Sequence, residues 1–155
     1  FLNDVYVTAA GTVYFTDSNT STIYTITNGK VETVHADATL GGTNGILVEE
    51  NTIYLAGYGS GNVYRMDMTT KSVEKIATDV PGGDGIVRYG EDLLVSNWNG
   101  QVYHVTMDGV VTLLLDSQEA KLNAADIEVI ADKNLLLVPT FFGNGVTAYE
   151  LKENK

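Results

Sequence analysis

The sequence predicts an all-β fold, a β-propeller of about four blades in which each blade has four antiparallel strands and the last has three. Similar apolar runs recur about every 40 residues. The runs are short, rich in Val, Ile, Leu, Thr and Tyr, and bounded by Gly, Asn and Asp, which is typical of strands. No segment keeps the 3.6-residue period of a helix. Four strands in about 40 residues match a propeller blade, whereas leucine-rich and β-helix solenoids repeat at about half that length or less.

The first strand of each repeat follows a turn-forming stretch and opens with a short amide or acid. These openings are Asn3-Asp4-Val5, Asn44-Gly45-Ile46, Asp84-Gly85-Ile86 and Asp126-Ile127. Their first residues lie 41, 40 and 42 positions apart. The repeats therefore cover residues 3–43, 44–83, 84–125 and 126–155 of a single domain, residues 1–155.

The remaining strands recur at the same spacing. Second strands are expected at Val13-Tyr14-Phe15, Ile53-Tyr54-Leu55, Leu93-Leu94-Val95 and Leu135-Leu136-Leu137. Third strands are expected at Ile23-Tyr24, Val63-Tyr64, Val102-Tyr103 and Ala148-Tyr149, and fourth strands at residues 31–36, 73–77 and 110–115. Asn28-Gly29 and Asp108-Gly109 are hairpin-turn dipeptides between third and fourth strands. The total is 15 strands, and the last repeat has no fourth strand.

A β-sandwich of 15 strands is the alternative fold, and the shared period makes it less favoured. A propeller commonly completes its last blade with a strand from the other end of the chain, but Phe1 leads directly into a first strand. We therefore expect an incomplete ring. A closed four-bladed ring and self-association through open blade edges are the alternatives.

The composition excludes several classes of partner. Nine Lys and Arg against 20 Asp and Glu give a net charge of −11, which disfavours nucleic acid and anionic membrane surfaces. No apolar run approaches the roughly 20 residues of a membrane-spanning helix. There is no cysteine, and His35 and His104 are far apart, so disulfides, thiolate chemistry and a histidine-built zinc site are not expected. The cellular compartment stays open, with an extracytoplasmic location favoured, and no signal peptide is present in these residues.

The candidate site follows from strand direction. Because the strands of a blade alternate in direction, the starts of first strands and the loops between second and third strands lie on one rim. Those loops, residues 17–20, 57–61, 97–100 and 140–145, carry Tyr58, Trp98, Phe141 and Phe142. Aromatic side chains near convergent amides are typical of a pocket for a small polar ligand.

Two interpretations of the strand openings stay open. The side chains of Asn3, Asn44, Asp84 and Asp126 offer hard oxygen ligands at the channel mouth, which suit Ca²⁺, Mg²⁺ or Mn²⁺. Asn-Gly and Asp-Gly are also turn formers, and a turn is needed where one blade passes to the next. Asp126 fits either pattern less well, because no glycine follows it.

The ordered set of motifs resembles the regucalcin/gluconolactonase family of β-propellers across essentially the whole chain. The resemblance rests on Leu2-Asn3-Asp4-Val5, Thr43-Asn44-Gly45-Ile46, Gly83-Asp84-Gly85-Ile86 and an ending from Ala125-Asp126-Ile127-Glu128 to Ala148-Tyr149-Glu150-Leu151. Each motif is short and partly shared with other propellers. The family implies a six-bladed ring, of which these residues would form part. Such a ring holds a divalent cation, often Ca²⁺, Zn²⁺ or Mn²⁺, and hydrolyses sugar lactones or related esters.

The resemblance also implies roles for particular residues. Asn44 and Asp84 match metal ligands, Asp84 is in addition the proposed general base, and Asn3 matches an asparagine that contacts substrate or holds metal-bound water. The family's other ligand is a glutamate of its first blade, which these residues do not include. Phe1 stands where the family commonly has an arginine.

We therefore expect a metal-dependent hydrolase acting on a lactone or sugar-like ligand. Its catalytic residue would be Asp84, its metal ligands Asn44 and Asp84, and its cofactor a divalent cation, Ca²⁺ first, with Mn²⁺, Mg²⁺ or Zn²⁺ as alternatives. Substrate contacts are expected from Asn3, Tyr58, Trp98 and Phe141. The alternative is a non-catalytic propeller that binds a carbohydrate, peptide or protein on the same rim.

Overall fold

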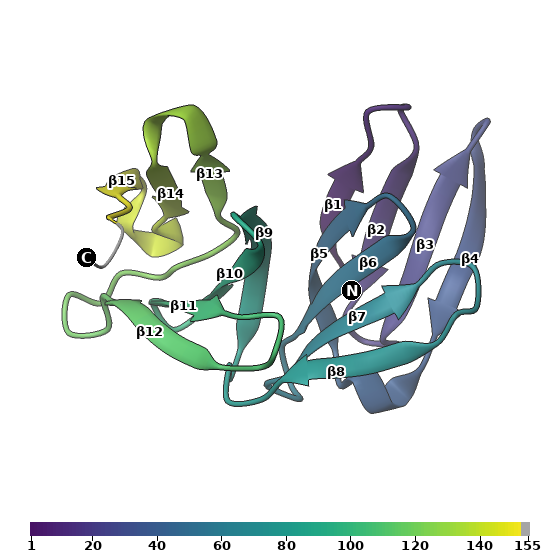
Figure 1. Ribbon diagram of the computed structural model, residues 1–155, viewed down its shortest axis with the longest axis horizontal. Coiled ribbons are helices and arrows are strands. Elements are labelled where there is room, and N and C mark those ends of the chain that lie inside the picture. The colour runs from purple at the N-terminus through teal and green to yellow at the C-terminus, as the bar shows by residue number, and fades with distance from the viewer. Residues whose placement is uncertain (153–155) are drawn as a thin grey trace.

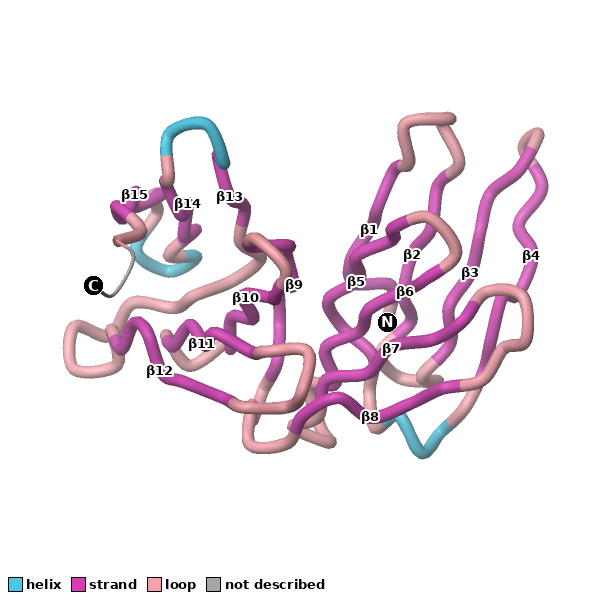
Figure 2. Tube along the Cα trace, viewed as in Figure 1, coloured by secondary structure: helices cyan, strands magenta, loops and turns pink. Residues whose placement is uncertain are grey.

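A computed structural model describes residues 1–152 of the chain, and its fold is the predicted all-β propeller. Fifteen strands form three four-stranded sheets and one three-stranded sheet, each with its strands in sequence order. The four sheets are arranged as the blades of a four-bladed β-propeller, from β1–β4 at the right of Figure 1 to β13–β15 at the left. Helical residues occur in short connections between strands (Figure 2). In residues 1–152 no helix is long and apolar enough to cross a membrane.

Every blade is an antiparallel meander. Blade 1 contains β1 (Leu2–Val7), β2 (Val13–Asp17), β3 (Thr22–Thr27) and β4 (Lys30–Ala36), and the 3₁₀ helix η1 (Ala38–Leu40) leads to blade 2. Blade 2 contains β5 (Thr43–Glu49), β6 (Thr52–Gly57), β7 (Val63–Asp67) and β8 (Val73–Ala77). Blade 3 contains β9 (Gly83–Tyr89), β10 (Asp92–Asn97), β11 (Gln101–Val105) and β12 (Val111–Asp116). Blade 4 contains β13 (Glu128–Ile130), η2 (Ala131–Lys133), β14 (Leu135–Pro139), η3 (Phe141–Gly143) and β15 (Val146–Glu150).

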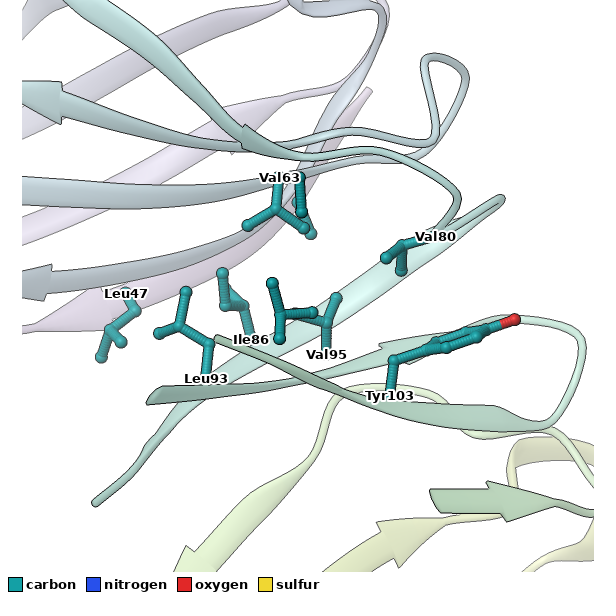
Figure 3. Close-up of a cluster of buried hydrophobic side chains, with 10 residues drawn as sticks. Leu47, Val63, Val80, Ile86, Leu93, Val95 and Tyr103 are labelled. Atoms are coloured by element: carbon teal, nitrogen blue, oxygen red, sulfur yellow. The ribbon is translucent and has the colours of Figure 1, made fainter. Parts of the chain in front are cut away.

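The core lies between the blades, in three hydrophobic clusters. Ile46, Val48 and Leu55 of blade 2 pack with Ile23 of blade 1. Blades 2 and 3 meet through a second cluster, of which Figure 3 labels Leu47, Val63, Val80, Ile86, Leu93, Val95 and Tyr103. A third cluster joins blades 3 and 4 and includes Leu94, Val102, Ile127, Leu136 and Val138. Three interfaces therefore hold four blades together, and their apolar burial is the main stabilising term.

The last blade is offset by one residue from the sequence repeat. Tyr64 of blade 2 pairs with Leu55, but Tyr149 of blade 4 pairs with Leu136. The structural counterpart of Leu55 is therefore Leu136, the middle residue of the run Leu135-Leu136-Leu137. Because side chains alternate along a strand, this shift turns Leu136 toward blade 3.

Glycines at the channel allow neighbouring first strands to approach closely. Asn44-Gly45 and Asp84-Gly85 lie within β5 and β9, beside irregularities in strand pairing, and not in a turn between blades. A Cβ atom on Gly45 would lie 2.0 Å from the carbonyl oxygen of Asp84, and one on Gly85 would lie 2.6 Å from the backbone nitrogen of Ile127. Each glycine is required by contact with the next blade.

One apolar face of blade 1 stays open. Val5 and Val7 are each 59% exposed, whereas Ile46 and Val48, at the same positions of blade 2, are 3% and 5% exposed. Among residues 1–152, extensive contacts join β1 with β5 and β5 with β9, and a smaller contact joins β9 with β13, but no comparable contact joins β13 with β1. The edge strand of blade 4 is β15, its third strand. In the other blades the edge is a fourth strand, which is β4, β8 or β12.

Candidate functional site

A pocket of about 700 Å³ opens at one end of the channel, on the rim that the sequence predicts. Its lining comes from all four blades, because each contributes the start of its first strand or the loop after its second. The pocket brings together every predicted site residue: Asn3, Asn44, Tyr58, Asp84, Trp98 and Phe141, together with Asp126. Its size is within the usual range for small-molecule sites.

Asn44 is the most buried polar side chain of this lining. It is 4% exposed, and its Oδ1 has no hydrogen-bond partner. The Thr16 hydroxyl donates a hydrogen bond to the Asn44 carbonyl oxygen at 2.8 Å, which fixes the backbone at this point. A buried acceptor without a partner is unfavourable by about 1–3 kcal/mol, so a ligand that occupies the Asn44 amide oxygen would remove a penalty from the folded protein.

Asp84 stands at the corresponding position of the next blade. Burial raises the pKa of its carboxyl to about 6, and the nearby negative charge of Asp126 adds to the rise, which the Asn44 amide partly opposes. A carboxyl of this kind is ionised at neutral pH and is still basic enough to accept a proton. A nearby cation would also stabilise the ionised form of this carboxyl and compensate for the water that burial removes.

Asp4 and Asp126 form a second acidic pair deeper along the channel. The two oxygens of Asp4 accept hydrogen bonds from the backbone nitrogens of Val5 and Ile46, at 2.7 and 2.8 Å. Burial and then the charge of Asp126 raise the pKa of Asp4 to about 7, and loss of water around the carboxyl also raises the pKa of Asp126. Negative charge is therefore concentrated on the channel axis and favours a cation there.

Two hydroxyl groups, which the sequence reasoning missed, position the strand openings. Thr16 accepts from the Asp4 nitrogen at 3.1 Å while it donates to Asn44. Ser96 accepts from the Gly85 nitrogen at 2.8 Å and donates to the Ala125 carbonyl oxygen at 2.7 Å. Each hydroxyl thus links a first strand to the next blade, beside a residue of the pocket. The available signal in the sequence was a Ser or Thr in the second strand of a blade, opposite the irregular start of the first strand.

Asn3 differs from its counterparts because it is exposed and already paired. Its Nδ2 donates to the Ser18 hydroxyl at 3.0 Å, and this hydroxyl donates to the Thr43 carbonyl oxygen at 2.8 Å. The amide oxygen of Asn3 remains available on the wall of the pocket. This arrangement is compatible with the predicted substrate contact.

Trp98 and Phe141 line one wall of the pocket, and Phe142 packs against both from outside the lining. The rings of Trp98 and Phe141 meet edge to face with centroids 4.8 Å apart, and Phe142 packs against both at 6.1 and 4.9 Å. Tyr58 lines another part of the wall and is exposed. We refer to Trp98, Phe141 and Phe142 as the aromatic shelf.

The donor set suits a hard cation better than a soft one. Among residues 1–152, no group of three or more His, Cys, Asp or Glu side chains is arranged to hold a metal ion. A cation in the pocket would therefore depend on the amide oxygen of Asn44 in addition to the carboxylates of Asp84 and Asp126. His35 and His104 lie in β4 and β11, outside the pocket lining.

No family model and no curated protein matches the sequence. Solved structures match over nearly the whole chain. A catalytically inactive virginiamycin B lyase from Staphylococcus aureus, solved with quinupristin, has a TM-score of 0.68 and 13% identity over 97% of this chain and 55% of its own. A luciferin-regenerating enzyme has a TM-score of 0.69 and 17% identity over 88% of this chain and 52% of its own.

A nidogen/laminin complex gives a TM-score of 0.73 with 17% identity, over 88% of this chain and 56% of that chain. At these identities the matches establish the β-propeller fold and not a family. The chain spans about half the length of these three structures. Propellers of this shape include enzymes as well as binding proteins.

Proposed function

We propose that the rim pocket binds a divalent cation, Ca²⁺ first, and hydrolyses a lactone or related ester in the manner of the gluconolactonase-like propellers that the sequence resembles. The observation that carries the proposal is the buried, unpartnered Oδ1 of Asn44 beside the carboxylate of Asp84. Amide and carboxylate oxygens are the ligands of Ca²⁺, with Mn²⁺ or Mg²⁺ as close alternatives and Zn²⁺ as a less suited one.

The residues of the chain divide the chemistry among them. A cation held by Asn44 and Asp84 would supply Lewis acidity toward a carbonyl oxygen and would acidify bound water. Asp84 would accept the proton of the attacking water. Asn3, anchored on Ser18, would orient the substrate through its amide oxygen, and Trp98 and Phe141 offer apolar surface on one side of the pocket.

Calorimetric titration of the chain with Ca²⁺, Mn²⁺ and Zn²⁺ tests the cation site. We expect binding in the micromolar range or tighter for Ca²⁺, lost in Asn44→Ala and in Asp84→Asn. Asn51→Ala is the matched control, because Asn51 follows β5 at the opposite rim and pairs with Asp67. Equal affinity in Asn44→Ala and the unchanged protein would contradict the site.

Hydrolysis is tested separately, by pH-stat assay with a panel of lactones and aryl esters in Ca²⁺ and in EDTA. We expect turnover only with the cation present, and its loss in Asp84→Ala. Cation binding without turnover on any member of the panel would refute the hydrolase and leave the binding site in place.

A non-catalytic binding propeller is the second candidate, and the exposure of Tyr58, Phe141 and Phe142 favours it. Exposed aromatic side chains around a polar centre are typical of recognition surfaces. In that case the rim would bind a carbohydrate, peptide or protein with the same affinity in EDTA as in Ca²⁺. The EDTA comparison therefore discriminates between the two functions.

A further inference from the structure

We infer that the aromatic shelf makes the pocket selective for a ligand with a flat apolar ring, and against a polyhydroxylated sugar. The inference rests on the proposed function in one respect: the ligand is taken to present a carbonyl group to the cation site. Ring selection depends on the pocket walls and is independent of catalysis.

The shelf is held in place from both sides. The backbone nitrogen of Trp98 donates to the Gly82 carbonyl oxygen at 3.0 Å, and the Trp98 carbonyl oxygen accepts from the side-chain amide of Asn123 at 2.8 Å. Phe141 packs on the indole edge to face at an interplanar angle of 62°. A ring that enters the pocket therefore meets aromatic surfaces that are already ordered, and it loses little conformational entropy of the protein on binding.

The polar side chains of the walls are poorly suited to a sugar. A polyhydroxylated ligand needs many free donors and acceptors, because each hydroxyl that is buried without a partner weakens binding. The Ser18 hydroxyl already accepts from Asn3 and donates to Thr43. The most buried free side-chain oxygens are those of Asn44 and Asp84, which the proposed cation site uses. The other polar side chains of the lining, Asn3, Asn19, Tyr58 and Asp126, are exposed.

The charge of the lining also restricts the ligand. Asp84 and Asp126 are acidic, and no Lys, Arg or His side chain belongs to the pocket lining among residues 1–152. Without the cation, a phosphate or carboxylate group would meet negative charge with no compensating side-chain cation. A bound divalent cation would offset the two carboxylates and leave no net positive charge to attract an anionic ligand. The pocket of about 700 Å³ accepts a neutral, ring-bearing lactone or ester of drug-like size.

Two lactams that cannot be hydrolysed under assay conditions test the inference. The aromatic probe is 3,4-dihydroquinolin-2(1H)-one and the polyhydroxylated probe is gluconolactam. Trp98 is the single tryptophan of the chain, so its emission with excitation at 295 nm reports on the shelf directly. We expect the aromatic lactam to shift this emission and to bind about tenfold or more tightly than gluconolactam by calorimetry, in Ca²⁺.

Variants separate the shelf from the rest of the protein. Phe141→Ala, at a residue that is 57% exposed and so tolerant of truncation, should weaken the aromatic lactam about tenfold and leave gluconolactam unchanged. Phe15→Leu is the control, because Phe15 stacks on Tyr24 in blade 1 outside the pocket lining. The inference would be overturned if gluconolactam bound more tightly than the aromatic lactam, or if Phe141→Ala reduced the affinity for both lactams equally. Binding of the aromatic lactam without lactone turnover would refute only the proposed hydrolase.

Discussion

The close approach of β5 and β9 at Gly45 gives the sharpest test of how the site is built. In Gly45→Ala, the added Cβ would lie 2.0 Å from the Asp84 carbonyl oxygen, where ordinary contacts begin at 3.4 Å. The two strands must therefore separate by about 1.4 Å at Asp84, the proposed general base. Overpacking of a well-packed interior reduces the free energy of unfolding by about 1–3 kcal/mol. Because the clashing atom is a backbone carbonyl oxygen, which cannot move aside as a flexible side chain can, we expect a loss at or above the upper end of this range.

The assay is urea unfolding followed by Trp98 emission, with calcium calorimetry on the same samples. A loss of about 3 kcal/mol corresponds to a fall of about 1.5 M in the urea midpoint, for a slope of about 2 kcal/mol per molar urea. Calcium affinity should fall as well, because Asp84 moves with its strand.

Gly145→Ala is the matched control. A Cβ at Gly145 meets nothing closer than 3.7 Å, and its φ is not positive, so alanine should be neutral or stabilising by up to about 1 kcal/mol. An unchanged midpoint in Gly45→Ala would show that Asn44-Gly45 is a local feature of the chain, and the requirement for close approach between blades would be wrong.

Three further outcomes are expected. Because the pKa values of Asp4 and Asp84 are raised to about 7 and 6 in the folded protein, it binds more protons than the unfolded chain between about pH 4 and 7. Stability in EDTA should therefore fall as pH rises through this range, and a higher urea midpoint at pH 8 than at pH 5 would contradict this. Ser96→Ala removes a buried hydroxyl with two partners and should reduce the free energy of unfolding by about 1–3 kcal/mol, measured by the same titration; a change below about 0.5 kcal/mol would exclude the linking role of this hydroxyl. The exposed face of blade 1 should promote association with a second copy, so light scattering should give a dimer mass that returns to the monomer mass when Val5 and Val7 are both changed to Lys; a monomer before substitution would refute this.

The architecture was predictable because its signals are local and repeated. Alternating apolar residues and turn dipeptides predict the strands, and the period groups them into blades. Strand direction then places the openings at Asn3, Asn44, Asp84 and Asp126 on the same rim as Tyr58, Trp98 and Phe141, and the structure confirms this grouping. The cation, the substrate and self-association stay predictions.

The interpretation of Gly45 and Gly85 could not be reached from sequence. Asn-Gly and Asp-Gly are strong turn signals, yet here the glycines leave room for the backbone of the next blade. The offset of blade 4 was hidden for a similar reason, because three successive leucines permit either register until the pairing of Tyr149 with Leu136 fixes one.

The sequence by itself therefore determined the number of strands, the repeat and the rim on which chemistry collects, since all three depend on neighbours in the chain. Only the tertiary structure decided which further groups meet: Asp4 with Asp126, and Thr16 and Ser96 with the blades that follow them. These partners lie from 28 to 122 positions apart, and their proximity depends on the packing angle of whole blades, which no local pattern encodes.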